Sequence, residues 1–213
     1  SDVNVRKAVA YAIDREAIVD NLVYGYGIPS NQWGVPGSPT FNDEITIGYD
    51  PDRARQLLAE AGYKDGVKIK FSAVNDPETQ QRATAIKGYL EDVGFEVELN
   101  IIDDALFREI TSAAPNKPWE GLMQYNFRGD SDLATYMPRN FSPQGTTYAH
   151  NIIHPEDIQA LYPEIRSATN QDDYQKVAYE LQRLVFEEHA LAVAIFVGTN
   201  PVAVHQSVQD TGI

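Results

Sequence analysis

The opening residues, 2–19, place apolar side chains at helical spacing in two successive short stretches. Asp2 and Asp14 stand where the N-cap of each stretch is expected, because a short polar side chain there satisfies free N–H groups of the first turn. Gly25 and Gly27 follow the second stretch and suit the end of a helix. The pattern predicts two amphipathic helices in tandem.

A regular succession of strands and helices follows in the first half of the chain. Helices are expected over residues 50–62 and 76–94, since each begins with Asp-Pro, a cap followed by the first helical position, and each ends at glycine. Residues 67–74 and 95–101 alternate apolar and polar side chains, as half-buried strands do. With a further helix over 105–113, the order predicts an α/β unit with right-handed crossovers.

The second half adds one strand and then a long helical region. Residues 119–127 are typical of a third strand, and the chain from Pro155 has helical periodicity with a break near Asn170. A continuous apolar strand is expected over 191–197 and a short returning strand over 201–204. The whole pattern predicts an α/β fold, with a mixed sheet flanked by helices.

Residues 28–47 show neither the spacing of a helix nor the alternation of a strand. This stretch of about twenty residues is longer than a connection needs, and long ordered loops are often functional. Its prolines and glycines exclude regular structure, while Trp33 and Phe41 are unusual in a linker between domains. An ordered loop is therefore the favoured interpretation, and a linker is the alternative.

Composition bounds the class of protein. The chain has 213 residues, of which 43% are hydrophobic and 23% charged, as in one large or two small globular domains. It contains no apolar run long enough to span a membrane. The start at Ser1 has neither the basic nor the apolar region of an export signal, so such a signal is expected either to lie outside this sequence or not to exist. Without cysteine, disulfides and thiol chemistry are excluded.

The charge of the chain argues against a nucleic-acid partner, and the absence of catalytic motifs argues against an enzyme. The formal net charge of −14 is unsuited to nucleic acid, which requires a basic surface. It favours solubility, with an acidic face for a cationic ligand as the alternative. The chain has no G-x-S-x-G, no G-x-x-x-x-G-K and no strand-linked G-x-G-x-x-G motif. We therefore expect a protein that is not an enzyme and has no cofactor.

Two histidines have the spacing of metal ligands on a helix. His150 and His154 are four residues apart, but Pro155 follows at once and puts the pair in a loop before a helix. His189 and His205 have no Cys or acidic residue at ligand spacing. No metal site is expected.

Several segments, in order along the chain, resemble one family. They are V-R-K-A-x-x-Y-A-I-D-R-E-A-I at 5–18, Y-D-P-x-x-A-x-x-L-L-x-x-A-G-Y at 49–63, L-E-D-V-G-F at 90–95, and the closing helix at 179–190, with Ala190 where proline is usual. This set resembles the peptide/nickel (family 5) extracytoplasmic solute-binding proteins of bacterial ABC importers.

The resemblance implies the C-terminal lobe of a two-lobed receptor with the type II periplasmic-binding-protein fold. Residues 1–213 would form one ligand-binding lobe, with 192–213 as the candidate path back toward the other lobe. Such receptors bind peptides between lobes that close by a hinge, and they deliver them to a membrane permease. They are expected to be monomers, either periplasmic or anchored at the cell surface as lipoproteins.

The resemblance leaves the ligand open. Members of the family that bind a nickel chelate, haem, an oligosaccharide or an amino-acid derivative would share the fold, and a sensory receptor is a further alternative. Genes for a permease and an ATPase beside this one would favour import over sensing.

One segment of the family grips the ligand's α-ammonium group with an aspartate. In G-W-x-x-D-Y-x-x-P, at the end of the third strand, the matching positions here are Phe127 and Asp130, with Asp132 as the fallback. A partly desolvated carboxylate would pair well with an ammonium group. The Trp, Tyr and Pro of the motif are missing, so Asp130 could instead be an N-cap for the segment through Tyr136.

Four more residues are candidates for ligand contact. Trp33 matches the region that lines the family's cleft, with packing in the core as the alternative. Asn31 and Gln32 could supply amide contacts from the same loop. Arg128 could meet a ligand carboxylate or could be a surface charge.

Overall fold

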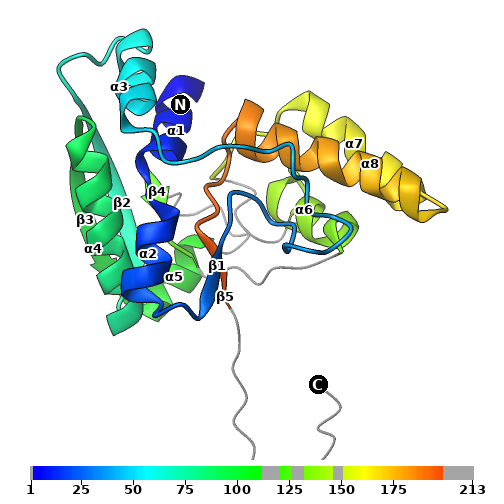
Figure 1. Cartoon of the computed structure of the whole chain (residues 1–213), viewed down its shortest axis with the longest axis horizontal. Coiled ribbons are helices and arrows are strands. Elements are labelled where there is room, and N and C mark those ends of the chain that lie inside the picture. Colours follow the sequence, from blue (N-terminus) through cyan, green and yellow to red (C-terminus); the bar gives the residue numbers. More distant parts are fainter. Residues whose placement is uncertain (1, 112–119, 126–131, 146–150, 199–213) are drawn as a thin grey trace, which may run out of the picture.

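Two hydrophobic cores organise the chain (Figure 1). The structure is a computed structural model that describes residues 2–111, 120–125, 132–145 and 151–198. One core lies between a small sheet and the first helices, at the left of the view. The second lies among the later helices, at the right. None of the helices in these described ranges is long and apolar enough to cross a lipid bilayer.

The first core is built on a three-stranded parallel sheet of order β3-β2-β4. Its strands are β2 (Val67–Val74), β3 (Phe95–Ile102) and β4 (Leu122–Met123). Helix α4 (Pro77–Asp92) connects β2 to β3, and α5 (Asp104–Thr111) follows β3. Parallel neighbours require such crossovers, so the strand-helix rhythm of the sequence dictates this pairing.

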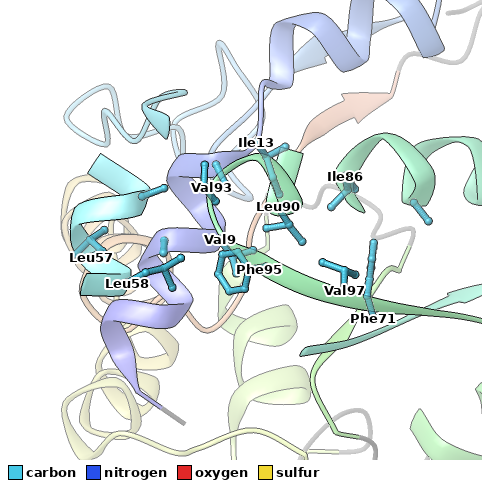
Figure 2. Packing of buried hydrophobic residues seen from close by; sticks show 14 of the residues in the cluster. Val9, Ile13, Leu57, Leu58, Phe71, Ile86, Leu90, Val93, Phe95 and Val97 are labelled. Atoms are coloured by element: carbon cyan, nitrogen blue, oxygen red, sulfur yellow. The ribbon is translucent and has the colours of Figure 1, made fainter. Parts of the chain in front are cut away.

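The helices α1 (Val3–Ala12), α2 (Arg15–Leu22) and α3 (Pro51–Glu60) complete the first core. Figure 2 shows Leu58 of α3 beside Val9 of α1 and Phe95 of β3, all of them buried. The caps predicted for these helices are confirmed. The side chains of Asp2, Asp14 and Asp50 accept hydrogen bonds from the first turns of α1, α2 and α3.

The second core is helical. Its elements are α6 (Leu133–Phe141), α7 (Glu156–Ser167), α8 (Gln171–Gln182) and the π-helix η1 (Arg183–Glu188). Asn170 caps α8 and produces the predicted break. The helix predicted to close at residue 190 is α-helical only to Gln182 and continues as the π-helix η1 to Glu188, a wider turn that the helical periodicity did not indicate.

A separate antiparallel pair joins the two halves of the chain. Strand β1 (Gly27–Pro29) pairs with β5 (Phe196–Gly198), so the end of the α2 region lies beside the end of the described chain. The α/β class with helices flanking small sheets is confirmed. Among the described residues, parallel and antiparallel pairing are both present, but in two separate sheets instead of one mixed sheet.

Strand predictions succeeded where a neighbouring strand is close in sequence. Residues 67–74 form a strand as predicted, and 95–101 extends by one residue. Of 119–127, the described strand is Leu122–Met123 alone. The prediction over 191–197 was wrong for its first part, since a strand starts only at Phe196, where β1 provides a partner. Residues 201–204 lie outside the described ranges.

Basic side chains of α1 and α2 hold the segment between the second core and β5. Arg6 Nε donates to the carbonyl of His189 at 2.8 Å, and Lys7 lies 3.8 Å from Glu188. Arg15 Nε donates to the carbonyl of Ala194, also at 2.8 Å. Residues 189–195, which we call the connector, are therefore tied to the start of the chain.

Of the stretch 28–47 that was predicted to lack regular structure, Ile28 and Pro29 belong to β1. The remaining loop at 30–47 is ordered, as the sequence favoured, and it is fixed to the second core by Gln182. This side chain is fully buried. Its amide oxygen accepts from the Gly34 N–H at 2.5 Å and its amide nitrogen donates to the carbonyl of Thr40. Gln175 Nε2 adds a bond of 2.7 Å to the carbonyl of Pro39. One glutamine side chain thus satisfies two buried backbone groups.

Replacing Gln182 with alanine should therefore lower the free energy of unfolding by about 2–3 kcal/mol, because both backbone groups lose their partner inside the protein. Urea unfolding measures this. The matched control is Gln81→Ala, at an exposed position of α4, which should stay within about 0.5 kcal/mol of the original. Equal effects of the two substitutions would contradict the role given to Gln182.

Candidate functional site

The carboxyl edge of the parallel sheet is the candidate site. β2, β3 and β4 run in the same direction, so Val74, Ile102 and Met123 end at one edge. In open α/β sheets, ligands bind outside this edge. Residues 126–131 follow β4 after only two residues, so the chain leads from this edge into the segment predicted to grip a ligand. Phe127, Arg128 and Asp130 themselves lie outside the described ranges.

Carboxylates at this edge are used to start helices. Asp76 follows β2 and caps α4, accepting from the Thr79 N–H at 2.9 Å. Asp103 follows β3 and accepts from the Leu106 N–H at 2.8 Å. Asp104 forms an ion pair of 2.7 Å with Arg108 on the next turn of α5. Each of these carboxylates therefore has a local partner, either a backbone N–H group or Arg108.

The pKa of Asp76 reflects this capping. Partial burial pushes the pKa of its carboxyl upward, but hydrogen bonds from Thr79 and the nearby guanidinium of Arg82 outweigh burial. The pKa of Asp76 therefore lies below its ordinary value, and the carboxylate is charged at neutral pH.

Asp132 caps α6. Its Oδ1 accepts from the Thr135 N–H at 3.2 Å, and the helix begins at Leu133, whose N–H donates to the hydroxyl of Tyr174 at 2.8 Å. The alternative that Asp130 is the N-cap of this helix is therefore wrong. Leu133 is buried in the second core and fixes the helix start one residue after Asp132. Asp132, the second candidate for ligand binding, is thus the N-cap of α6.

Trp33 packs on the second core. Its ring centroid lies 5.0 Å from that of Phe141 and 5.8 Å from that of Phe186, with the latter pair edge-on. Such tilted and edge-on contacts are favourable aromatic geometries. Trp33 is only partly buried, so packing accounts for part of its surface.

The amides of Asn31 and Gln32 bind the loop itself. Gln32 is 1% exposed, and its amide exchanges two hydrogen bonds of 2.8 Å with the backbone of Asn42. Asn31 Nδ2 donates to the carbonyl of Ile45 at 2.8 Å, with a longer bond to Ile47. In this structure both side chains hold the loop that carries Trp33.

The candidates therefore fall at two ends of one helix. Asp132 stands before the first residue of α6, and Trp33 contacts Phe141, its last. At 1.5 Å per residue, these ends are about 13 Å apart. The structure places Trp33, Asn31 and Gln32 in one loop, at the end of α6 away from Asp132.

Two residues at the edge escaped sequence analysis. Tyr125, two residues before Phe127, has 48% of its surface exposed and stacks on Phe107. Gln124 Oε1 is buried and accepts no hydrogen bond from any residue in the described ranges. The available signal was position: both follow the third strand, two and three residues before Phe127.

Other features of the described surface carry no candidate chemistry. Two open hollows lie at the amino edge of the sheet, opposite the candidate site, around Lys64, Gly66 and Gly94. His154 Nδ1 lies 3.0 Å from the carbonyl of Phe141, and His150 is outside the described ranges. Within those ranges, no three His, Asp or Glu side chains come together as a metal site would require.

Comparison with known proteins adds the family. Residues 1–148 match the model for bacterial extracellular solute-binding proteins, family 5, middle region. The dipeptide-binding protein of Escherichia coli K12 is 28% identical over 213 aligned positions, covering 91% of this chain and 37% of that protein. Heme-binding protein A of Haemophilus influenzae is 42% identical over 71 residues, covering 33% of this chain and 13% of that protein.

A solved structure shows the same fold. The dipeptide-binding protein of Pseudoalteromonas sp. SM9913, crystallised with Met-Leu, superposes with a TM-score of 0.78 at 19% identity. The match covers 92% of this chain and 40% of that one. This chain thus spans about two fifths of the length of the dipeptide-binding proteins it matches.

The hydrogen bond by which Asp76 caps α4 should make the stability of the protein depend on pH. Asp76→Ala should lower the free energy of unfolding at pH 7 by about 1 kcal/mol, whereas Asp76→Asn, which keeps a capping oxygen, should cost less. A carboxyl whose pKa is lowered by folding stabilises the folded protein at pH values above the pKa that it has in the unfolded chain. This contribution disappears as the pH falls through the pKa of the folded state. The difference between the original and the asparagine variant should therefore shrink from pH 5 to pH 3, about the range in which Asp titrates. Urea unfolding at a series of pH values tests this, and a difference that grew on acidification would refute it.

Proposed function

The chain belongs to family 5 of the bacterial extracellular solute-binding proteins, and from this we propose that it is the C-terminal, ligand-binding lobe of an ABC-importer receptor for peptides. The family consists of binding proteins, not enzymes. Capture would occur at the carboxyl edge of the sheet, where a second lobe closes over the ligand by a hinge.

The extent of the likeness to a dipeptide-binding protein is the observation that carries the proposal. That alignment runs over 91% of this chain, so it includes the sheet, its carboxyl edge and the helices of the second core. A likeness confined to the opening helices would say little about the ligand.

The proposed mechanism gives Asp130 the ligand's α-ammonium group. Because Asp132 already caps α6, the helix start does not need a carboxylate at 130. Phe127 would lie against the ligand and Arg128 would meet its carboxylate, while the loop of Asn31, Gln32 and Trp33 would border the cleft. A charge-assisted hydrogen bond in a closed, partly desolvated cleft is strong enough to select ligands with a free amino terminus.

A second candidate ligand is haem. The 42% identity to a haem-binding protein favours it locally, but that alignment covers only a third of this chain. The fold and the hinge mechanism would be the same, and the aspartate at 130 would then have no ammonium group to bind. The ligand chemistry of Asp130 therefore separates the two candidates.

The partners and location follow from the same proposal. A receptor of this kind delivers its ligand to the permease of the importer and works outside the cytoplasm. It would act as a monomer, in the periplasm or held at the cell surface as a lipoprotein.

In the complete receptor, Asp130→Asn should weaken binding of short peptides by about tenfold to a hundredfold, the value of a buried hydrogen bond to a charged group. Isothermal titration calorimetry with one peptide, free and N-acetylated, measures this. The acetylated peptide should bind the original receptor weakly and be insensitive to the substitution.

The matched control is Asp132→Asn, which retains an oxygen for the α6 cap and should leave affinity unchanged. Full peptide affinity in the Asp130→Asn variant would refute the assignment. A loss confined to the Asp132→Asn variant would transfer the ammonium contact to that residue.

A further inference from the structure

His189 is held by helices of both hydrophobic cores. Its backbone carbonyl accepts a hydrogen bond of 2.8 Å from Nε of Arg6 in α1, a helix of the first core. Its ring Nε2 lies 2.8 Å and 3.0 Å from the two carboxylate oxygens of Asp157, in the first turn of α7, a helix of the second core. The connector begins at this residue and leads to β5 (Figure 1). The start of the connector is therefore attached to both cores through one residue.

The ends of two helices favour opposite charges at these positions. His189 is the C-cap of η1, and its N–H donates to the carbonyl of Leu184 at 2.9 Å. Asp157 is an acidic residue in the first turn of α7. The dipole of a helix stabilises a cation near its carboxyl end and an anion near its amino end. Both helices thus favour an ion pair between a protonated His189 and Asp157.

The other charged side chains around this pair come from α1, α8 and η1, and they are Arg6, Lys7, Glu180, Arg183 and Glu188. The two glutamates are bound by the same arginine, at 2.8 Å and 2.6 Å, so each has a cation of its own. The arginine and the lysine of α1 act against a further positive charge at His189. The carboxylate of Asp157 acts in favour of that charge from hydrogen-bond distance.

The carboxyl of Asp157 is ionised at neutral pH. Partial burial pushes its pKa upward, but hydrogen bonds from His189 and from the Ile158 N–H, the latter at 2.8 Å, outweigh burial and keep the pKa of Asp157 below its ordinary value. Histidine side chains ordinarily change their charge between about pH 5 and 8. Asp157 therefore remains an anion throughout the range in which histidine titrates.

Protonation of the imidazole strengthens this contact. A neutral imidazole donates from Nε2 in one of its two tautomers, whereas an imidazolium carries hydrogen on both ring nitrogens and a full positive charge. A hydrogen bond between two charged groups is stronger than one with a neutral donor. The pair therefore contributes more to stability below the range in which histidine titrates, and part of that contribution is lost as the pH rises through this range. The two side chains are 26% and 49% exposed, so water screens the pair and limits the gain.

We propose that the contact between His189 and Asp157 is a pH-dependent latch, which holds the start of the connector more firmly to α7 in mildly acidic solution than above neutral pH. The connector leads from the second core to β5, so the latch controls how firmly this path between the two parts of the chain is fixed. The inference holds for any ligand of the receptor.

The test is hydrogen exchange of the complete receptor at pH 5.5 and pH 8, measured by mass spectrometry and corrected for the intrinsic exchange rate at each pH. The N–H groups of His189 and Leu191 report on the latch, because they donate to the carbonyls of Leu184 and Val185 at the start of the connector. Their protection should be about twofold to fivefold higher at pH 5.5, the range expected for a partly exposed ion pair.

Two variants remove the latch from different sides. His189→Gln keeps a hydrogen-bond donor but does not titrate, and Asp157→Asn removes the anion. Each should abolish the difference in protection between the two pH values at residues 189–191. The matched control is Asp104→Asn, which removes the anion of an exposed ion pair of 2.7 Å with Arg108 on α5 and should leave that difference unchanged.

A pH dependence that persisted in both variants would overturn the latch, as would its absence from the original receptor. A change of the same size throughout the chain, with α4 included, would assign the effect to global unfolding and would also overturn it. Agreement of the two variants, with the change confined to the connector and its neighbours, is the result that the latch requires.

Discussion

The buried guanidinium of Arg15 joins separate parts of this chain. It donates to the carbonyl of Ala194 in the connector and to the carbonyls of Ala10 and Ile13 between α1 and α2. Burial lowers its pKa to about 10, so it remains charged at neutral pH and requires these acceptors. Since the connector leads into β5, and β5 pairs with β1, this one side chain relates the first core to the strand pair and to the loop of Trp33.

The arrangement suits a lobe that moves as a rigid body. The loop at 30–47 is bound to the second core by Gln182, and the connector is bound to the first by Arg6 and Arg15. The carboxyl edge of the sheet is fixed by the parallel ladder. Hinge closure of two such lobes would bring preformed surfaces together around a ligand, which limits the ordering cost of capture.

Local signals in the sequence were sufficient for much of this fold. The Asp-Pro pairs and the glycines that follow located α3 and α4, because helix capping involves residues close in sequence. The alternation of apolar and polar residues located β2 and β3, because half-burial of a strand is visible over a few residues. Sequence alone did not indicate that a strand begins only at Phe196, since its partner β1 lies about 170 residues earlier and strand pairing is tertiary. In the site, Asp132 as the α6 cap was missed because Asp130 fitted the same pattern. The stack of Tyr125 on Phe107 depends on the packing of α5, which no spacing reveals.

The central claim is that this lobe belongs to a receptor whose cargo is peptide. Native mass spectrometry of the complete receptor, purified gently from its own cells, tests it most directly, because receptors that close two lobes around a ligand often retain it. The account predicts a series of added masses that match short peptides and disappear after mild unfolding and refolding. A single added mass of haem, of a metal chelate or of a sugar, with no peptide among the bound species, would contradict it.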